Sequence, residues 1–148
     1  VPIIRDIAQG LRFLHAADPP LVHGDVKSQN ILVEGSTRFR AKVTDFGFSH
    51  MKTSGLRGSP FFMPPEVLNG ETPTSAADVY AFAVLLCEVY GRSDPYEGQD
   101  SALVLEQVKD TSRYPPKRCV VPYECPTELS QLIKECWDND KDMRPNFR

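Results

Sequence analysis

One short stretch of the chain carries side chains whose types and spacing suit the transfer of a phosphoryl group. The stretch HGDVKSQN covers residues 23–30 and contains Asp25, Lys27 and Asn30. A carboxylate can accept or orient the proton of a hydroxyl group, an ammonium group can neutralise a phosphate, and an amide oxygen can bind Mg²⁺. We therefore predict that this stretch serves phosphoryl-transfer chemistry.

The segments on either side of this stretch are expected to hold it between a helix and a small hairpin. Apolar residues recur at steps of three and four in residues 3–16, which is the period of an amphipathic helix. Two short apolar segments, 30–33 and 41–44, are separated by a turn-rich segment at 35–37 and predict a β-hairpin.

The rest of the chain is predicted to be helical apart from one long loop. Residues 51–65 show no regular period and are rich in Gly, Ser, Thr and Pro, which favours a loop. Residues 75–90 are apolar nearly all the way round, so we expect a helix buried on every side. Further helices are predicted at 101–110 and 127–137. The expected fold class is mainly α with a small β-hairpin.

Size and composition point to an ordinary globular domain. The chain has 148 residues, of which 41% are hydrophobic and 25% charged, so it can bury a core and resembles an average soluble domain. A formal net charge of -3 offers no basic surface for nucleic acid. The longest apolar run, residues 79–87, is far shorter than the ~20 residues that a bilayer requires, so no membrane span is predicted.

The cysteines are expected to be reduced. Their spacing contains no C-x-x-C pair and no neighbouring histidine, which excludes the usual zinc signatures. A chain of this size does not need disulfides to build a core, so free thiols in a cytoplasmic protein are predicted. The four positions are Cys87, Cys119, Cys125 and Cys136.

The chemically suited stretch is followed by further motifs in a familiar order. Residues 45–47 read Asp-Phe-Gly, residues 58–66 read GSPFFMPPE, Asp78 opens the apolar segment, and Cys136-Trp137 precedes Arg144-Pro145. Together with residues 23–30, these motifs resemble the C-terminal lobe of eukaryotic protein kinases, most closely Ser/Thr kinases of the tyrosine-kinase-like group. The implied architecture is that lobe of the α+β protein-kinase-like fold.

The resemblance implies a role for each candidate site residue. Asp25 would accept or orient the proton of the substrate hydroxyl, and Lys27 would lie against the transferring phosphate. Asn30 and Asp45 would bind the magnesium ions that accompany ATP. Leu32 would form an apolar floor under the adenine. ATP and Mg²⁺ are the implied cofactors, and a protein is the implied substrate.

The same resemblance implies positions that support the site. Glu66 and Arg144 would form a buried ion pair, because the planar guanidinium meets a carboxylate with two hydrogen bonds. Asp78 would accept hydrogen bonds from the backbone N–H groups near His23 and Gly24.

The histidines are expected to have no part in the chemistry. His23 would stack with Phe46 in the core, as a packing residue and not a proton carrier. His15 and His50 have no catalytic neighbours in the sequence, so we predict that both lie on the surface or in a loop.

Two positions depart from the kinase pattern. Most kinases carry arginine where Gly24 stands, and that arginine pairs with a phosphorylated residue of the activation segment. We therefore expect control by another mechanism than this pairing. Pro64 replaces the usual alanine before Pro65-Glu66 and stiffens the segment that shapes the substrate pocket.

Acceptor specificity can be argued from three residues. Lys27 stands where Ser/Thr kinases and the tyrosine-kinase-like group carry lysine. Ser59 stands where Ser/Thr enzymes place a threonine that hydrogen-bonds the catalytic Asp and Lys. Phe48 resembles the large residue associated with a preference for serine.

The resemblance covers only one lobe. We expect residues 1–148 to form the C-terminal lobe of a catalytic domain, with the N-terminal lobe missing as its partner in cis and a final helix cut short at 146–148. Two alternatives stay open: a pseudokinase that works as a scaffold, and a truncated product that binds a partner without catalysis.

Overall fold

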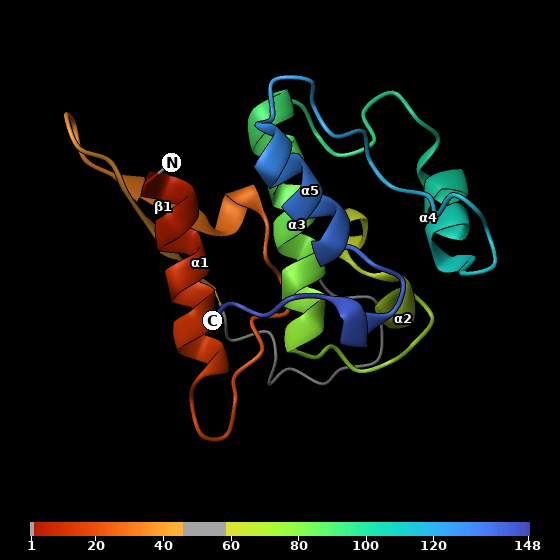
Figure 1. The fold of residues 1–148 in the computed structure, drawn as a ribbon, viewed down its shortest axis with the longest axis horizontal. Coiled ribbons are helices and arrows are strands. Elements are labelled where there is room, and N and C mark those ends of the chain that lie inside the picture. The colour runs from red at the N-terminus through yellow and green to blue at the C-terminus, as the bar shows by residue number, and fades with distance from the viewer. Residues whose placement is uncertain (1, 46–58) are drawn as a thin grey trace.

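A central helix, α3, spans Ser75–Gly91 and organises the part of the chain that the structure describes (Figure 1). The structure is a computed structural model, and it describes residues 2–45 and 59–148. Every residue from Ala77 to Cys87 is buried, so all faces of the helix are covered by other segments. This confirms the helix predicted for residues 75–90 and its burial on every side over residues 77–87, while Val89 near its end is exposed.

Helix α1, Pro2–His15, is amphipathic and buries Ile7, Leu11 and Leu14 along one face. The helix predicted at residues 3–16 is confirmed, because these side chains recur at the expected steps of three and four. The buried face packs against strand β2 of the hairpin, and Figure 1 shows α1 beside the two strands.

The hairpin consists of β1, Ile31–Glu34, and β2, Arg40–Val43. The strands pair antiparallel, with Ile31 opposite Val43. The predicted strand bounds, 30–33 and 41–44, are each wrong by one residue. At the first strand the reason is local, because Asn30 belongs to the short 3-10 helix η1, Ser28–Asn30, and its side chain is buried there.

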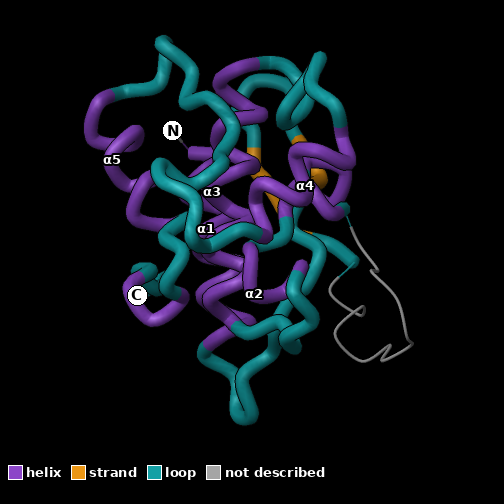
Figure 2. The backbone as a smooth tube through the Cα atoms, turned by 90° about the vertical axis from the view of Figure 1, so that its right-hand side faces the viewer, coloured by secondary structure: helices purple, strands orange, loops and turns teal. Residues whose placement is uncertain are grey.

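Helices α4, Ser101–Lys109, and α5, Thr127–Cys136, confirm the two remaining helix predictions. The first turn of α4 is capped by Asp100, whose carboxylate accepts a hydrogen bond from the N–H of Leu103 at 2.9 Å. Helix α5 packs against α3. Figure 2 shows that helices and loops make up most of the described chain, so the predicted fold class, mainly α with a small hairpin, is confirmed.

Short helical turns replace part of the loop predicted for residues 51–65. Pro60–Phe62 forms the 3-10 helix η3, and Pro65–Leu68 forms α2. A third short helix, η4, spans Lys141–Met143. Each is one turn or less, which is too short to show a helical period in the sequence. Residues 51–58 of the predicted loop lie outside the described residues.

All four cysteines are free and buried in the structure. Within residues 2–45 and 59–148, no three His, Cys, Asp or Glu side chains are grouped so that they could hold a metal ion. None of the described helices is long and apolar enough to cross a membrane.

A buried ion pair joins α2 to the C-terminal segment, as predicted. The Arg144 guanidinium donates to both carboxylate oxygens of Glu66, from Nη1 at 2.7 Å and from Nη2 at 2.8 Å. It also donates to the carbonyl oxygens of Ala76 and Asp138, at 3.1 Å and 2.8 Å. The Arg144 side chain is fully buried, so its charge depends on these acceptors for stabilisation.

We expect Glu66→Gln to lower the free energy of unfolding by about 3–5 kcal/mol, because it leaves the buried Arg144 charge without a carboxylate. Chemical denaturation of the full-length protein would measure the loss. Glu71→Gln is the matched control, since Glu71 pairs with Lys141 at 3.0 Å on the exposed surface and exposed pairs contribute little. Equal losses in both variants would contradict the assignment.

Candidate active site

Residues 23–30 are tied to the central helix by the carboxylate of Asp78. Asp78 is buried in the first turn of α3. Its Oδ2 accepts a hydrogen bond from the N–H of His23 at 2.8 Å, and its Oδ1 accepts one from the N–H of Gly24 at 2.9 Å. Both hydrogen bonds were expected from the family resemblance of the sequence. They fix the start of the loop that carries the candidate catalytic residues.

His15 also contacts Asp78, so its prediction as a surface residue is wrong. Its Nε2 lies 2.7 Å from Asp78 Oδ2, and its side chain is only 12% exposed. The ring also packs against Phe147, with centroids 5.6 Å apart. The sequence gives no local signal for this contact, because His15 and Asp78 are 63 residues apart. His50 lies outside the described residues.

His23 is fully buried, and both of its ring nitrogens are engaged by the backbone. Nδ1 accepts a hydrogen bond from the N–H of Asp25 at 3.0 Å, so Nε2 must carry the proton that reaches Thr44 O at 2.7 Å. His23 was predicted to be a packing residue and not a proton carrier, and its burial and the engagement of both ring nitrogens fit that prediction. The stacking partner expected for it, Phe46, lies outside the described residues.

Asp25, Lys27 and Asn30 converge as the spacing in the sequence indicated. The Asn30 amide nitrogen donates to Asp25 O at 2.8 Å and to Asp25 Oδ2 at 3.1 Å. Lys27 Nζ lies 3.5 Å from the same Oδ2. Because the amide nitrogen of Asn30 makes its hydrogen bonds to Asp25, its amide oxygen is the atom that could bind a metal ion.

Lys27 is further held by Ser59. Its Nζ donates to Ser59 Oγ at 2.8 Å, and the two residues are 32 positions apart. This hydrogen bond between Ser59 and Lys27 was expected. No hydrogen bond between Ser59 and Asp25 is found, so the expected contact with the aspartate is absent from the described part of the chain.

Asp45 and Leu32 lie on the hairpin side of the site. Thr44 donates to Asn30 O from its N–H at 2.9 Å and from its hydroxyl at 3.2 Å, which holds the residue before Asp45 beside Asn30. Asp45 is exposed with a φ of 58°, a left-handed conformation that Asp adopts more readily than most residues. Leu32 is 52% exposed on β1. Phe46, Gly47 and Phe48 lie outside the described residues.

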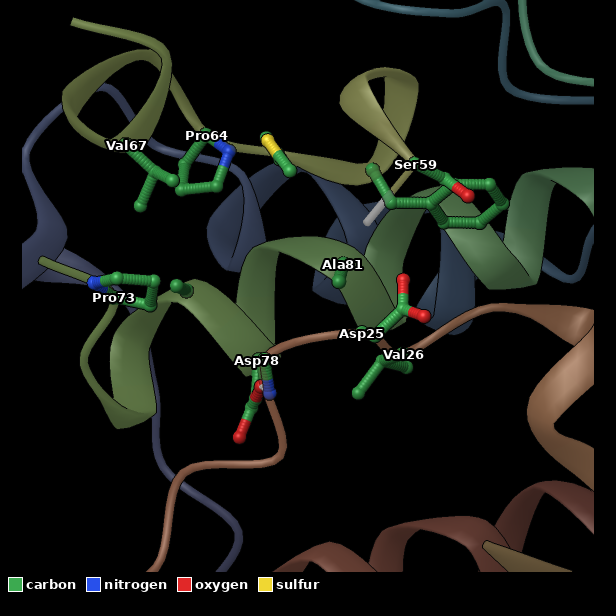
Figure 3. Close-up of a pocket in the computed structure, with 12 residues that line it drawn as sticks. Asp25, Val26, Ser59, Pro64, Val67, Pro73, Asp78 and Ala81 are labelled. Carbon is green, nitrogen blue, oxygen red and sulfur yellow. Dashed lines mark hydrogen bonds between the residues drawn. The ribbon is translucent and has the colours of Figure 1, made fainter. Parts of the chain in front are cut away.

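A small hollow adjoins the Asp25 carboxylate (Figure 3). Its volume is about 50 Å³, and most of its wall is apolar. Figure 3 shows Ser59 near Asp25, with Pro64 and Val67 on the other side of the hollow. Pro64, the departure noted in the sequence, is therefore part of the wall next to the candidate catalytic carboxylate.

Gly24 adopts a backbone conformation that other residues tolerate poorly. Its φ is +82°, and a Cβ added there would meet nothing within 4 Å. Glycine adopts this conformation without the strain that a side chain adds, and the space around the position is open. The sequence alone indicated only that the backbone is freer at this position.

Comparison with known proteins connects this site to one family. The family model described as "Protein tyrosine and serine/threonine kinase" matches residues 1–148. The chain is 36% identical to "Probable serine/threonine-protein kinase drkC" of Dictyostelium discoideum, over 97% of this chain and 19% of that protein. It is 34% identical to "Dual specificity protein kinase shkC" of the same organism, over 97% of the chain and 29% of that protein.

A plant relative gives the same picture. The chain is 35% identical to "Serine/threonine-protein kinase CTR1" of Arabidopsis thaliana, over 96% of the chain and 17% of that protein. The chain therefore spans less than a third of the length of each of these relatives.

We expect Gly24→Ala to destabilise the protein by about 1–2 kcal/mol, because an L-residue in the left-handed region brings its Cβ against the backbone. Chemical denaturation of the full-length protein would measure this change. Gly24→Asn is the matched control and should lose less, since Asn adopts positive φ more readily. An alanine variant as stable as the wild type would contradict the strain argument.

Proposed function

The chain belongs to the protein tyrosine and serine/threonine kinase family, and from this premise we propose that it is the C-terminal lobe of a protein serine/threonine kinase. The full-length enzyme transfers the γ-phosphoryl group of MgATP to a Ser or Thr hydroxyl of a protein substrate. One observation carries the proposal: Lys27 and Asn30 both contact the Oδ2 atom of Asp25. Lys27 is also held by a hydrogen bond to Ser59.

Each side chain has a chemical task in this proposal. Asp25 orients the substrate hydroxyl and accepts its proton, and Lys27 neutralises charge on the phosphate. Asn30 and Asp45 offer the amide and carboxylate oxygens that Mg²⁺ prefers, so these residues fit that ion. When bound, Mg²⁺ would supply positive charge to offset the charge that develops on the transferring phosphate. Leu32 offers exposed apolar surface to the adenine.

The acceptor class follows from the contact between Lys27 and Ser59. A lysine held by a hydroxyl residue next to the catalytic aspartate favours Ser/Thr over Tyr as the acceptor. The drkC and CTR1 relatives carry the name of serine/threonine kinase, while the shkC relative is named dual specificity.

The catalytic domain needs a second lobe in this proposal. Both lobes of a kinase grip ATP, and the Gly-rich loop and its lysine belong to the N-terminal lobe. Leu32 on β1 is 52% exposed, which supplies apolar surface for that lobe to cover. The buried free cysteines fit a reducing compartment, so we propose a cytoplasmic location.

We expect Asp25→Asn in the full-length protein to lower kcat by roughly 10²–10⁴-fold, because the amide cannot accept the hydroxyl proton. Transfer of labelled phosphate from MgATP to a generic protein substrate would measure it. Asp110→Asn, the same substitution in an exposed turn, should leave the rate unchanged. No transfer by either the wild type or the variants, together with no ATP binding, would favour a scaffold without catalysis.

We expect residues 1–148 alone to show no detectable phosphate transfer, because the groups that grip the ATP phosphates from the other lobe are missing. The same assay, with the full-length protein beside the fragment, would test this. A cooperative thermal transition of the fragment would show that it is folded. Clear transfer by the fragment would overturn the division into two required lobes.

A further inference from the structure

Two buried cysteines from distant parts of the chain share one cavity. Cys87 lies near the C-terminal end of α3, and Cys119 lies in the segment that joins α4 to α5. Only 5% and 8% of these residues are exposed. Both residues line a cavity of about 200 Å³.

The packing of the surrounding backbone holds the two segments together. A Cβ added to Gly91 would lie 3.2 Å from Pro122 Cγ, so the end of α3 touches the segment that contains Cys119. Gly91 and Pro122 line the same cavity as the two cysteines. Figure 1 shows the segment that leads into α5 passing over this end of α3. The packing of these two segments therefore keeps Cys87 and Cys119 on one cavity.

The two thiols line one cavity, and their mutual influence makes them unequal. It lowers the pKa of Cys119 and raises the pKa of Cys87, and burial raises the pKa of Cys87 further. The charge of Arg118 also favours the Cys119 thiolate. Cys119 is therefore the better nucleophile of the pair, because the thiolate is the reactive form.

The other cysteines are less suited to react. Burial raises the pKa of Cys136 to about 12, and it raises the pKa of Cys125 as well. Cys125 also contributes to the raised pKa of Cys87, so it is the alternative cysteine that could pair with Cys87. Since no metal-binding group of three is found in the described residues, a metal site does not account for these thiols.

We propose that Cys87 and Cys119 form a reversible intramolecular disulfide when the protein meets hydrogen peroxide or an organic hydroperoxide. The Cys119 thiolate attacks a peroxide oxygen, so that an S–O bond forms and the O–O bond breaks. The departing hydroxide or alkoxide takes up the proton that Cys119 had released. Cys119 is then a sulfenic acid.

The second step closes the disulfide. The sulfur of Cys87 attacks the sulfenic sulfur of Cys119, the S–S bond forms, the S–O bond breaks, and hydroxide leaves as water with the proton of Cys87. The two sulfur atoms together lose two electrons, which reduce the peroxide to water and, for a hydroperoxide, an alcohol. A dithiol reductant reverses the reaction. The cross-link ties the end of α3 to the segment before α5.

The test treats the reduced full-length protein with hydrogen peroxide, blocks the remaining thiols, and maps the non-reduced digest by mass spectrometry. We expect one cross-linked peptide pair that contains Cys87 and Cys119, lacks two hydrogen atoms, and disappears after treatment with a dithiol. Cys87 joined to Cys125, or both thiols still free after treatment, would overturn the proposal. This measurement needs no variant and does not depend on kinase activity.

Three variants assign the order of the steps. Cys119→Ala should leave Cys87 reduced under the same treatment. Cys87→Ala should leave a sulfenic acid on Cys119 that a cyclic diketone traps. Cys136→Ala is the matched control, a buried cysteine outside the cavity, and should keep the cross-link. Thermal melts of the reduced variants establish that each is folded. A sulfenic acid on Cys87 in the Cys119→Ala variant would reverse the proposed roles.

Discussion

The geometry of the candidate active site depends on one carboxylate placed inside an otherwise apolar helix. Asp78 lies in the stretch of α3 from Ala77 to Cys87, in which every residue is buried. A charge without partners would be strongly unfavourable there. Its oxygens accept hydrogen bonds from His23, Gly24 and His15, so the charge is stabilised by the loop that it holds. Helix and loop therefore stabilise each other.

The long elements of the fold could be predicted from the sequence because each repeats a pattern over several turns. Helices α1, α3, α4 and α5 were found within one or two residues of their ends. The one-turn helices could not be found in the same way. Pro60–Phe62 and Pro65–Leu68 are formed by packing against α3 and α4, and their sequences contain no full period.

In the candidate site, too, local patterns could be predicted from the sequence and contacts between distant segments could not. Asp25, Lys27 and Asn30 were identified because they lie within a few residues of one another and the spacing itself limits the chemistry. Contacts made across the chain were visible only where a family pattern pointed to them, as for Glu66 and Arg144. His15 shows the limit, since its partner is 63 residues away and no local feature marks it.

The contacts of Asp78 also set the order in which the site can be completed. Gly24 and Asp78 are 54 residues apart, so a chain made from its N-terminus exposes the loop well before its anchor exists. Closing so long a segment costs conformational entropy before any contact compensates for it. The anchored geometry of the loop therefore requires the first turn of α3, so the candidate site is complete only when segments 54 residues apart have come together.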